Sequence, residues 1–221
     1  MGSELVVLEY FKDTIGVYEN ALSKSMCDEI IEEFEKREDL HYKGYSLRVP
    51  QDEQDQDFFD RIKNTVEMRI SNQQIEKFDR WCKIFEEVSW TNVVDLLGKF
   101  GYHNEFNPYT VLDYGKVHWP LWKLNSYEKN KGHYNAFHTE QPYSKGSCHR
   151  LFVTMFYLND IEEGGETCFP FSDIKVKPKA GTSVVWPAGW PWVHRANKST
   201  SDKKYIITSW MCADWGKDLP W

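Results

Sequence analysis

The segment GHYNAFHTEQPY, residues 132–143, contains a histidine and a glutamate two positions apart, His138 and Glu140. If residues 134–140 form a strand, both side chains point to the same side of it, because side chains in a strand alternate with a period of two. One imidazole and one carboxylate on a shared face can supply two ligands of a non-haem iron site, which needs a second imidazole as its third ligand. His194, which follows a turn-rich stretch and precedes a good candidate strand, is the expected third ligand.

The His-x-acid pattern is not specific by itself. In a chain with 7 histidines and 34 acidic residues among 221 positions, about one such pair is expected by chance. A second pair, His103 and Glu105, does occur, in the polar segment GYHNEFNPYT next to an Asn-Pro step. We interpret this second pair as loop residues. The weight given to His138 and Glu140 therefore depends on the sequence that follows them.

The composition limits the classes of function. The net charge of -7 argues against a general nucleic-acid or anionic-membrane binder. No apolar stretch approaches the ~20 residues of a membrane span, and the N-terminus lacks the apolar core of a signal peptide. The 5 cysteines are scattered without a CxxC pair, which argues against a disulfide framework, and Cys148, His149 and Cys168 lack the spacing of a structural zinc site. We expect a soluble, cytoplasmic protein with reduced thiols.

The first hundred residues predict mainly helices. Residues 4–18 indicate a strand and a turn, and Ser25 is expected to be the N-cap of a helix with Asp28 and Glu29 in its first turn. Apolar residues at helical spacing predict three further helices, over 58–70, 75–85 and 93–98.

Short strands and turn residues dominate from about residue 105 onward. Strands are expected at 111–112, 122–124, 151–158, 181–186 and 205–211. Glycine- and proline-rich turns at this spacing are typical of an antiparallel sandwich or jelly roll. We predict one α+β domain, 1–221, in which residues 1–105 are mainly helical support. Residues 106–221 are predicted to form the catalytic core, a jelly roll or double-stranded β-helix.

Residues 124–211 resemble the iron(II)- and 2-oxoglutarate-dependent dioxygenases of the prolyl 4-hydroxylase type. The resemblance rests on landmarks that occur in the family's order: Tyr127 and Tyr134 before the His-x-Glu pair, Arg150 at the start of RLFVTMFYLN, the turn GGETCFP at 164–170, His194, and Lys204 at the start of KYIITSW. An isolated His-x-Glu is weak, but the ordered series is specific. A weaker similarity extends to CDEIIEEFE near the N-terminus.

The resemblance implies a role for each landmark. His138, Glu140 and His194 would be the catalytic iron(II) ligands. Lys204 stands where the family places the cation that binds the far carboxylate of 2-oxoglutarate, although it could instead be a strand-edge charge. Further contacts to the cosubstrate would come from Tyr127, Tyr157 and Thr208, and contacts to the substrate from Arg150, Tyr134 and Trp210; the tyrosines could equally be packing residues.

The reaction implied by the resemblance consumes 2-oxoglutarate and dioxygen, releases succinate and carbon dioxide, and hydroxylates an unactivated C–H bond, with ascorbate as an expected reductant. Glu140 departs from the family's commoner aspartate, but its carboxylate argues against halogenation, because related halogenases lack this ligand. The implied substrate is a peptidyl proline. A small molecule or another amino acid stays open, because the metal motif does not encode the substrate.

Two other classes of protein stay open. A catalytically silent jelly-roll binding module would keep the fold, although the complete triad with Lys204 argues against it. A zinc hydrolase could use the same three ligands, but it would leave Lys204 and the KYIITSW strand unexplained.

Overall fold

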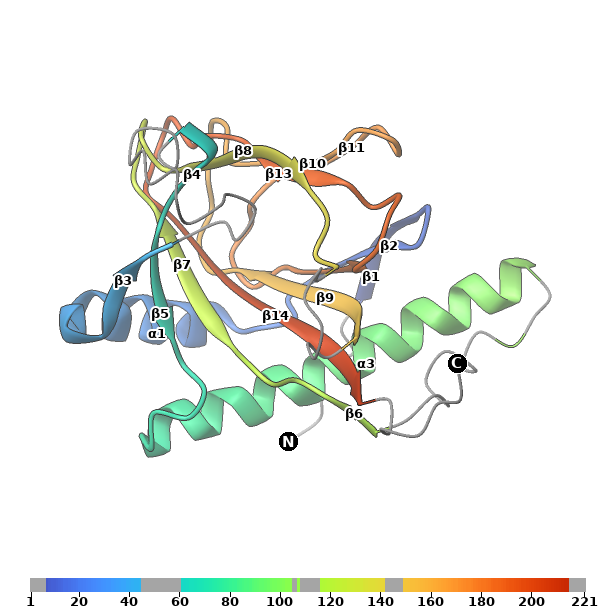
Figure 1. The fold of residues 1–221 in the computed structure, drawn as a ribbon, viewed down its shortest axis with the longest axis horizontal. Coiled ribbons are helices and arrows are strands. Elements are labelled where there is room, and N and C mark those ends of the chain that lie inside the picture. The colour runs from blue at the N-terminus through green and yellow to red at the C-terminus, as the bar shows by residue number, and fades with distance from the viewer. Residues whose placement is uncertain (1–6, 45–60, 105–106, 108–115, 142–148, 215–221) are drawn as a thin grey trace, which may run out of the picture.

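The computed structural model describes residues 7–44, 61–104, 107, 116–141 and 149–214. Within these ranges, two antiparallel sheets lie one above the other (Figure 1). The helices α1 (Lys24–Lys36) and α3 (Glu76–Asn104) lie beneath the larger sheet, on the face turned away from the smaller sheet. A short 3-10 helix, Glu38–Leu40, follows α1.

The larger sheet contains strands from both halves of the chain. Its order in the described residues is β1-β2-β12-β9-β14-β7-β5-β3, and β6 pairs with β14. These strands are β1 (Val7–Lys12), β2 (Ile15–Glu19), β3 (His41–Lys43), β5 (Val66–Arg69), β6 (Lys116–His118), β7 (Lys123–Tyr127), β9 (His149–Tyr157), β12 (Ser183–Pro187) and β14 (Lys204–Asp214).

The smaller sheet has the order β11-β10-β13-β8-β4 in the described residues. Its strands are β4 (Lys63–Asn64), β8 (His133–His138), β10 (Thr167–Phe169), β11 (Ile174–Val176) and β13 (His194–Ala196). From β7 to β14 the chain crosses repeatedly between the two sheets. This is the predicted α+β fold with a jelly-roll core, and the predicted strands at 122–124, 151–158, 181–186 and 205–211 correspond to β7, β9, β12 and β14. The predicted strand at 111–112 lies outside the described residues.

Two buried clusters hold these layers together. One joins the helices to the larger sheet, and in it Phe85 of α3 packs against Trp122 and Phe156 with ring centroids 5.2 and 5.6 Å away. The other is formed by residues on the inner faces of the sheets, such as Tyr157, Trp186 and Ile206. Burial of apolar area at about 25 cal/mol per Å² is the main stabilising effect in both clusters.

The helix predictions need three corrections. Helix α1 begins two residues earlier than expected, because the side chain of Ser23, not Ser25, accepts a hydrogen bond from the Met26 N–H (3.2 Å). No acidic residue lies in its first turn. The helices predicted at 75–85 and 93–98 are one 29-residue helix, α3. Apolar residues of this helix from Phe78 to Leu97 belong to one buried cluster with the sheet, and Gly98 is accommodated inside the helix despite its low propensity.

The predicted helix at 58–70 is wrong over residues 63–70, where the chain forms β4 and β5. Residues 58–60 lie outside the described residues, and only 61 and 62 are helical. Here the buried residues include the polar Lys63, Thr65 and Glu67, which alternate along an extended chain. Pairing with β8 and β7 determines this conformation, and such tertiary pairing overrides a local apolar repeat.

Residues from the first hundred positions therefore complete both sheets, and the division of the chain at residue 105 stays a prediction.

Lys175, Lys177 and Lys179 are exposed, as their alternation indicates. Within the described ranges, no helix combines the length and hydrophobicity needed to cross a bilayer.

The packing of α3 on the sheet gives a first prediction. Phe85→Ala should lower the free energy of unfolding by about 3–5 kcal/mol, because the side chain is fully buried and its removal leaves a cavity. Urea denaturation measures this change. Lys83→Ala, at an exposed position of the same helix, should change stability by less than about 0.5 kcal/mol. Similar losses in both variants would contradict the packing described for α3.

Candidate metal centre

The register of two neighbouring strands brings the two predicted histidine ligands together. His194, the first residue of β13, is the direct cross-strand partner of His138, the last residue of β8. Directly opposite residues of an antiparallel pair project to the same face. The two imidazole rings accordingly lie with centroids 4.3 Å apart, and both side chains are buried.

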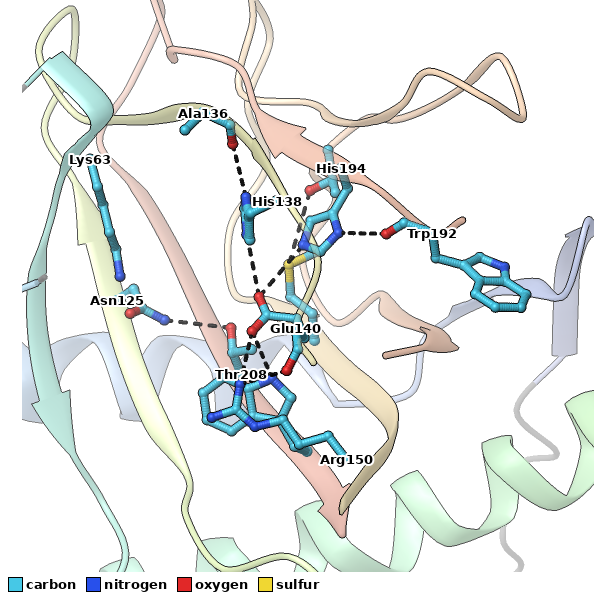
Figure 2. A network of polar contacts seen from close by, with 12 residues as sticks. Lys63, Asn125, Ala136, His138, Glu140, Arg150, Trp192, His194 and Thr208 are labelled. Carbon is cyan, nitrogen blue, oxygen red and sulfur yellow. Dashed lines mark hydrogen bonds and ion pairs between the residues drawn. The ribbon is translucent and has the colours of Figure 1, made fainter. Parts of the chain in front are cut away.

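Glu140 completes the group from just beyond the end of β8, which differs from the expected strand over 134–140. Its backbone N–H donates to the carbonyl of Ala188 (3.0 Å), which fixes the chain after the strand. Its Oε1 atom lies 3.3 Å from Nε2 of His138 and 3.6 Å from Nε2 of His194. The ligand atoms of the three residues all lie within 4.8 Å of one another (Figure 2).

The hydrogen bonds of the imidazoles determine which nitrogen faces the centre. Nδ1 of His138 lies 2.9 Å from the carbonyl oxygen of Ala136, and Nδ1 of His194 lies 3.1 Å from that of Trp192. A carbonyl only accepts, so each Nδ1 carries a proton and each Nε2 presents a lone pair. Three acceptor atoms thus converge on one point. Two imidazole nitrogens and one carboxylate oxygen fit the facial triad of a non-haem iron(II) site.

The second oxygen of Glu140 is held from the other side. The indole N–H of Trp210 donates to Oε2 (3.0 Å), and the guanidinium of Arg150 donates both to Oε2 (3.2 Å) and to the Glu140 carbonyl (2.9 Å). Arg150 also stacks over the Trp210 ring, 3.9 Å from its centroid. These contacts orient Glu140 so that Oε1 faces the histidines. The structure thus places both residues against a predicted ligand, and their predicted contact with substrate stays untested.

The protonation states suit metal binding. Burial opposes ionisation of Glu140, but its interactions with the adjacent His138 and His194 outweigh burial and hold the pKa of this carboxyl well below its usual range. Burial, followed by the effect of His194, lowers the pKa of His138. A metal ligand must be deprotonated. An ionised carboxylate beside a neutral imidazole is therefore already in the form that binds an ion.

Lys204 lies deep between the sheets, on the same face of β14 as Trp210, and is 1% exposed. Its ammonium donates to the carbonyl of Gly165 (2.9 Å) and lies 4.4 Å from the centroid of the Tyr127 ring. Gly164 and Gly165 both have positive φ, which the GGET turn needs to aim this carbonyl inward. Burial lowers the pKa of Lys204 to about 7, with Glu166 and Cys168 acting in the opposite sense. A buried cation with one neutral acceptor is suited to an anionic ligand.

The other predicted cosubstrate and substrate residues also line this interior, but with different partners. The hydroxyl of Tyr157 is bonded to Thr167 (2.6 Å) and to the carbonyl of Val176 (3.1 Å), and Thr208 accepts from Asn125 at 3.5 Å. Tyr134 stacks on the His138 ring with centroids 3.8 Å apart. Their predicted roles toward ligands stay predictions.

The two other groups of possible metal ligands in the sequence each include a residue outside the described residues. His103 belongs to helix α3, so its interpretation as a loop residue is wrong, and Glu105 lies outside the described residues. Cys148 of the conceivable zinc cluster also lies outside them. Of the tryptophans near the site, Trp186 is buried against His194, with centroids 5.0 Å apart, whereas Trp190 is 73% exposed.

Sequence reasoning missed a buried ionic cluster beside the site, formed by Lys63, Glu67 and Lys123. Lys63 lies 5.0 Å from the Tyr134 ring centroid, and Lys123 lies 5.6 Å from that of Trp210. The segment with Lys63 and Glu67 was predicted as a helix. Only the alternation of Lys63, Thr65 and Glu67 could have indicated that these polar side chains share one face of an extended chain.

Comparisons with known proteins support the interpretation of this geometry as a non-haem iron(II) site. Residues 122–212 match the family model of the 2OG-Fe(II) oxygenase superfamily. The probable prolyl 4-hydroxylase 9 of Arabidopsis thaliana is 28% identical over 106 residues, which cover 38% of this chain and 36% of that protein. The chain thus spans well under half the length of such curated relatives.

Two solved structures have a similar fold. The viral collagen prolyl hydroxylase of Paramecium Bursaria Chlorella virus-1, in its 2OG complex, is 20% identical with a TM-score of 0.62, over 91% of this chain and 97% of that one. A prolyl hydroxylase in complex with a hypoxia inducible factor oxygen degradation domain peptide fragment from Trichoplax adhaerens is 15% identical, with a TM-score of 0.65 over 91% and 84% of the two chains. These findings confirm the resemblance and the jelly-roll fold predicted from the sequence.

The converging ligand atoms lead to a prediction about metal affinity. His194→Ala should weaken Mn(II) binding by about a hundred-fold or more, because it removes one of three ligands, while the fold is kept. Anaerobic titration followed by electron paramagnetic resonance measures the affinity, and circular dichroism checks the fold. His149→Ala, at an exposed position of β9, is the matched control and should bind Mn(II) like the unaltered protein. Equal affinities in the two variants would exclude His194 as a ligand.

Proposed function

We propose that this chain, a prolyl 4-hydroxylase-like protein of the 2OG-Fe(II) oxygenase superfamily, hydroxylates an unactivated C–H bond with iron(II), 2-oxoglutarate and dioxygen. The substrate in this proposal is a peptidyl proline, and the coproducts are succinate and carbon dioxide. The proposal rests on one observation above all. Two imidazole nitrogens and one carboxylate oxygen converge in the interior of a jelly roll that also holds the buried cation Lys204.

The iron centre, when loaded, supplies the oxidative chemistry that couples decarboxylation of 2-oxoglutarate to hydroxylation. The protein's own residues position that chemistry. The backbone carbonyls of Ala136 and Trp192 hold the two imidazoles in one tautomer and orientation. Trp210 and Arg150 occupy Oε2 of Glu140 and leave Oε1 for the ion. Because the three side chains would hold the ion from one side, its other side would stay open to cosubstrate and oxygen.

Lys204 binds the far carboxylate of 2-oxoglutarate in this proposal. The ammonium exchanges its weak partner, the Gly165 carbonyl, for a charged one, and a charge-assisted bond in a water-excluded site is worth about 1.5–3 kcal/mol. The wall around it consists of Tyr127, Tyr157 and Ile206, all buried. These side chains exclude water and so strengthen the ion pair.

The peptide substrate is inferred from the relatives. Those with detectable sequence similarity are named prolyl 4-hydroxylases, and one similar structure holds a peptide fragment. In this chain Tyr134, Arg150 and Trp210 surround the triad from three strands or strand ends, where they can contact a substrate beside the ion. The zinc-hydrolase alternative has no use for Lys204, and a silent binding module has no use for the complete triad.

The decisive assay measures succinate formed from 2-oxoglutarate by protein loaded anaerobically with iron(II), then given ascorbate, air and proline-rich peptides. The unaltered protein should form succinate and a peptide product heavier by one oxygen, and His138→Ala should form neither. The Mn(II)-binding control His149→Ala should retain turnover. Hydrolysis of an ester or amide by zinc-loaded protein, without succinate from the iron-loaded form, would contradict the oxygenase proposal.

The lowered pKa of Lys204 predicts how cosubstrate affinity depends on pH. With a pKa of about 7 in the free protein, the amine is charged below pH 7 and neutral above it. Binding of a dicarboxylate raises that pKa, so binding above pH 7 must take up a proton. The affinity for 2-oxoglutarate should therefore fall by up to about ten-fold per pH unit between pH 7 and 9.

Isothermal titration of 2-oxoglutarate into Mn(II)-loaded protein, from pH 6 to 9 without oxygen, measures this dependence. Lys204→Arg is the matched control, because a guanidinium stays charged over the whole range. Its affinity should vary little with pH. Parallel pH profiles in the unaltered protein and in Lys204→Arg would exclude Lys204 as the carboxylate ligand.

A further inference from the structure

One buried carboxylate beside the metal centre is shared by two ammonium groups. Lys63 donates to Oε1 of Glu67, Lys123 donates to Oε2 (2.9 Å), and the hydroxyl of Thr65 donates to Oε1 (3.3 Å). The side chains of Lys63 and Glu67 are 7% and 4% exposed, and that of Lys123 is 16% exposed. Two ammonium groups share one carboxylate, so the cluster has one positive charge in excess, and Lys123 is the more accessible of the two cations.

The sheet register adds a further cation to this face. Arg69 of β5 lies directly opposite Lys123 of β7, and Lys123 lies directly opposite Thr208 of β14. Like charges directly opposite each other in an antiparallel pair destabilise the sheet. Arg69 is exposed, so this cross-strand row runs from solvent into the site. A row of cations that costs stability in the free protein is suited to binding an anion.

This row ends at the side chains that surround the triad. The Lys123 ammonium is 5.6 Å from the centroid of the Trp210 ring, the same ring on which Arg150 stacks and whose N–H is bonded to Glu140. In Figure 2, Lys63 points toward Asn125, which is bonded to Thr208 beside Glu140. The excess charge therefore faces the space next to the metal ligands, not a distant part of the surface.

The ligands of the proposed reaction leave this charge uncompensated. Iron(II) and Lys204 together balance Glu140 and the two carboxylates of 2-oxoglutarate. Among the described residues that surround the site, Lys123, Arg69 and Arg150 then keep their positive charges, while Glu67 is balanced by Lys63. Electrostatic complementarity favours a negatively charged partner at such a place.

We propose that Lys123, with Arg69 and Arg150, binds a carboxylate of the substrate, so that the protein selects substrates with a negative charge close to the hydroxylated carbon. This inference rests on the proposed function for the position of the substrate. The carboxylate can belong to an acidic side chain next to the proline in a peptide or to a free terminal carboxylate. Both sources present the same group to the same cations, and matched ligands distinguish them.

The test compares binding of charged and neutral ligand pairs to protein loaded with Mn(II) and 2-oxoglutarate without oxygen. One pair is a proline-rich peptide with Asp or Asn next to the proline, and the other is N-acetylproline with N-acetylprolinamide. The unaltered protein should bind the charged member of at least one pair about ten-fold more tightly. That preference should shrink as the salt concentration is raised from 50 to 500 mM.

Lys123→Met keeps the aliphatic length of the side chain and should abolish the preference, and Arg69→Met should reduce it. Lys36→Met, which removes one exposed charge from α1, is the control for net charge and should keep the preference. Thermal unfolding of each variant checks the fold. Because Lys63 still balances Glu67, Lys123→Met should unfold at a temperature close to that of the unaltered protein.

Equal binding of charged and neutral members by the unaltered protein, or no binding of either pair, would overturn the inference. An unchanged preference in folded Lys123→Met would overturn it too. A failure of the proposed reaction can be distinguished from a failure of the proposed carboxylate site. Charge-dependent binding of a peptide without its hydroxylation under air and iron(II) would reject the reaction but keep the carboxylate site. Hydroxylation without charge preference would keep the reaction but reject the carboxylate site.

Discussion

The direct pairing of His138 with His194 across β8 and β13 is the constraint on which the rest of the site depends. These two residues lie 56 positions apart in the sequence and share one face only because the two strands pair in this register. A slip by one residue would turn one imidazole to the other face of the sheet. Glu140 reaches the same point because its backbone is fastened to Ala188, in the connection that leads to β13. The site is thus built into the sheet, and its geometry is as rigid as the strand pairing.

The interior that holds these ligands is unusual for its buried charge. Glu140, Lys204, Lys63 and Glu67 are all withdrawn from water to a large extent, and each such charge costs several kcal/mol unless it is paired. Glu67 is paired inside the protein. Glu140 is paired with Arg150 through Oε2, but its Oε1 faces the imidazoles of His138 and His194. Lys204 donates to a neutral carbonyl, that of Gly165. A cation at the triad and a carboxylate at Lys204 would relieve both costs, which links the electrostatics of the fold to its proposed ligands.

The sequence predicts the parts of this arrangement that depend on local pattern. Alternating or continuous apolar runs indicate β9, β12 and β14, and the ordered landmarks from Tyr127 to Lys204 single out the three residues predicted to be ligands. What the sequence does not indicate depends on long-range pairing. The repeat from Phe58 to Ile70 has helical spacing, yet β4 and β5 form because β8 and β7 offer them hydrogen-bonding partners. The cationic cluster was missed for the same reason, since Lys63 and Lys123 become neighbours only through the sheet.

A crystal structure of the protein soaked with Mn(II) and 2-oxoglutarate in the absence of oxygen would show directly whether the three residues hold an ion and Lys204 binds the cosubstrate. We expect one ion bound by Nε2 of His138, Nε2 of His194 and Oε1 of Glu140. We also expect the chelating end of 2-oxoglutarate on that ion and its far carboxylate on the Lys204 ammonium. An ion held by other side chains, or a cosubstrate whose far carboxylate lies away from Lys204, would contradict the account.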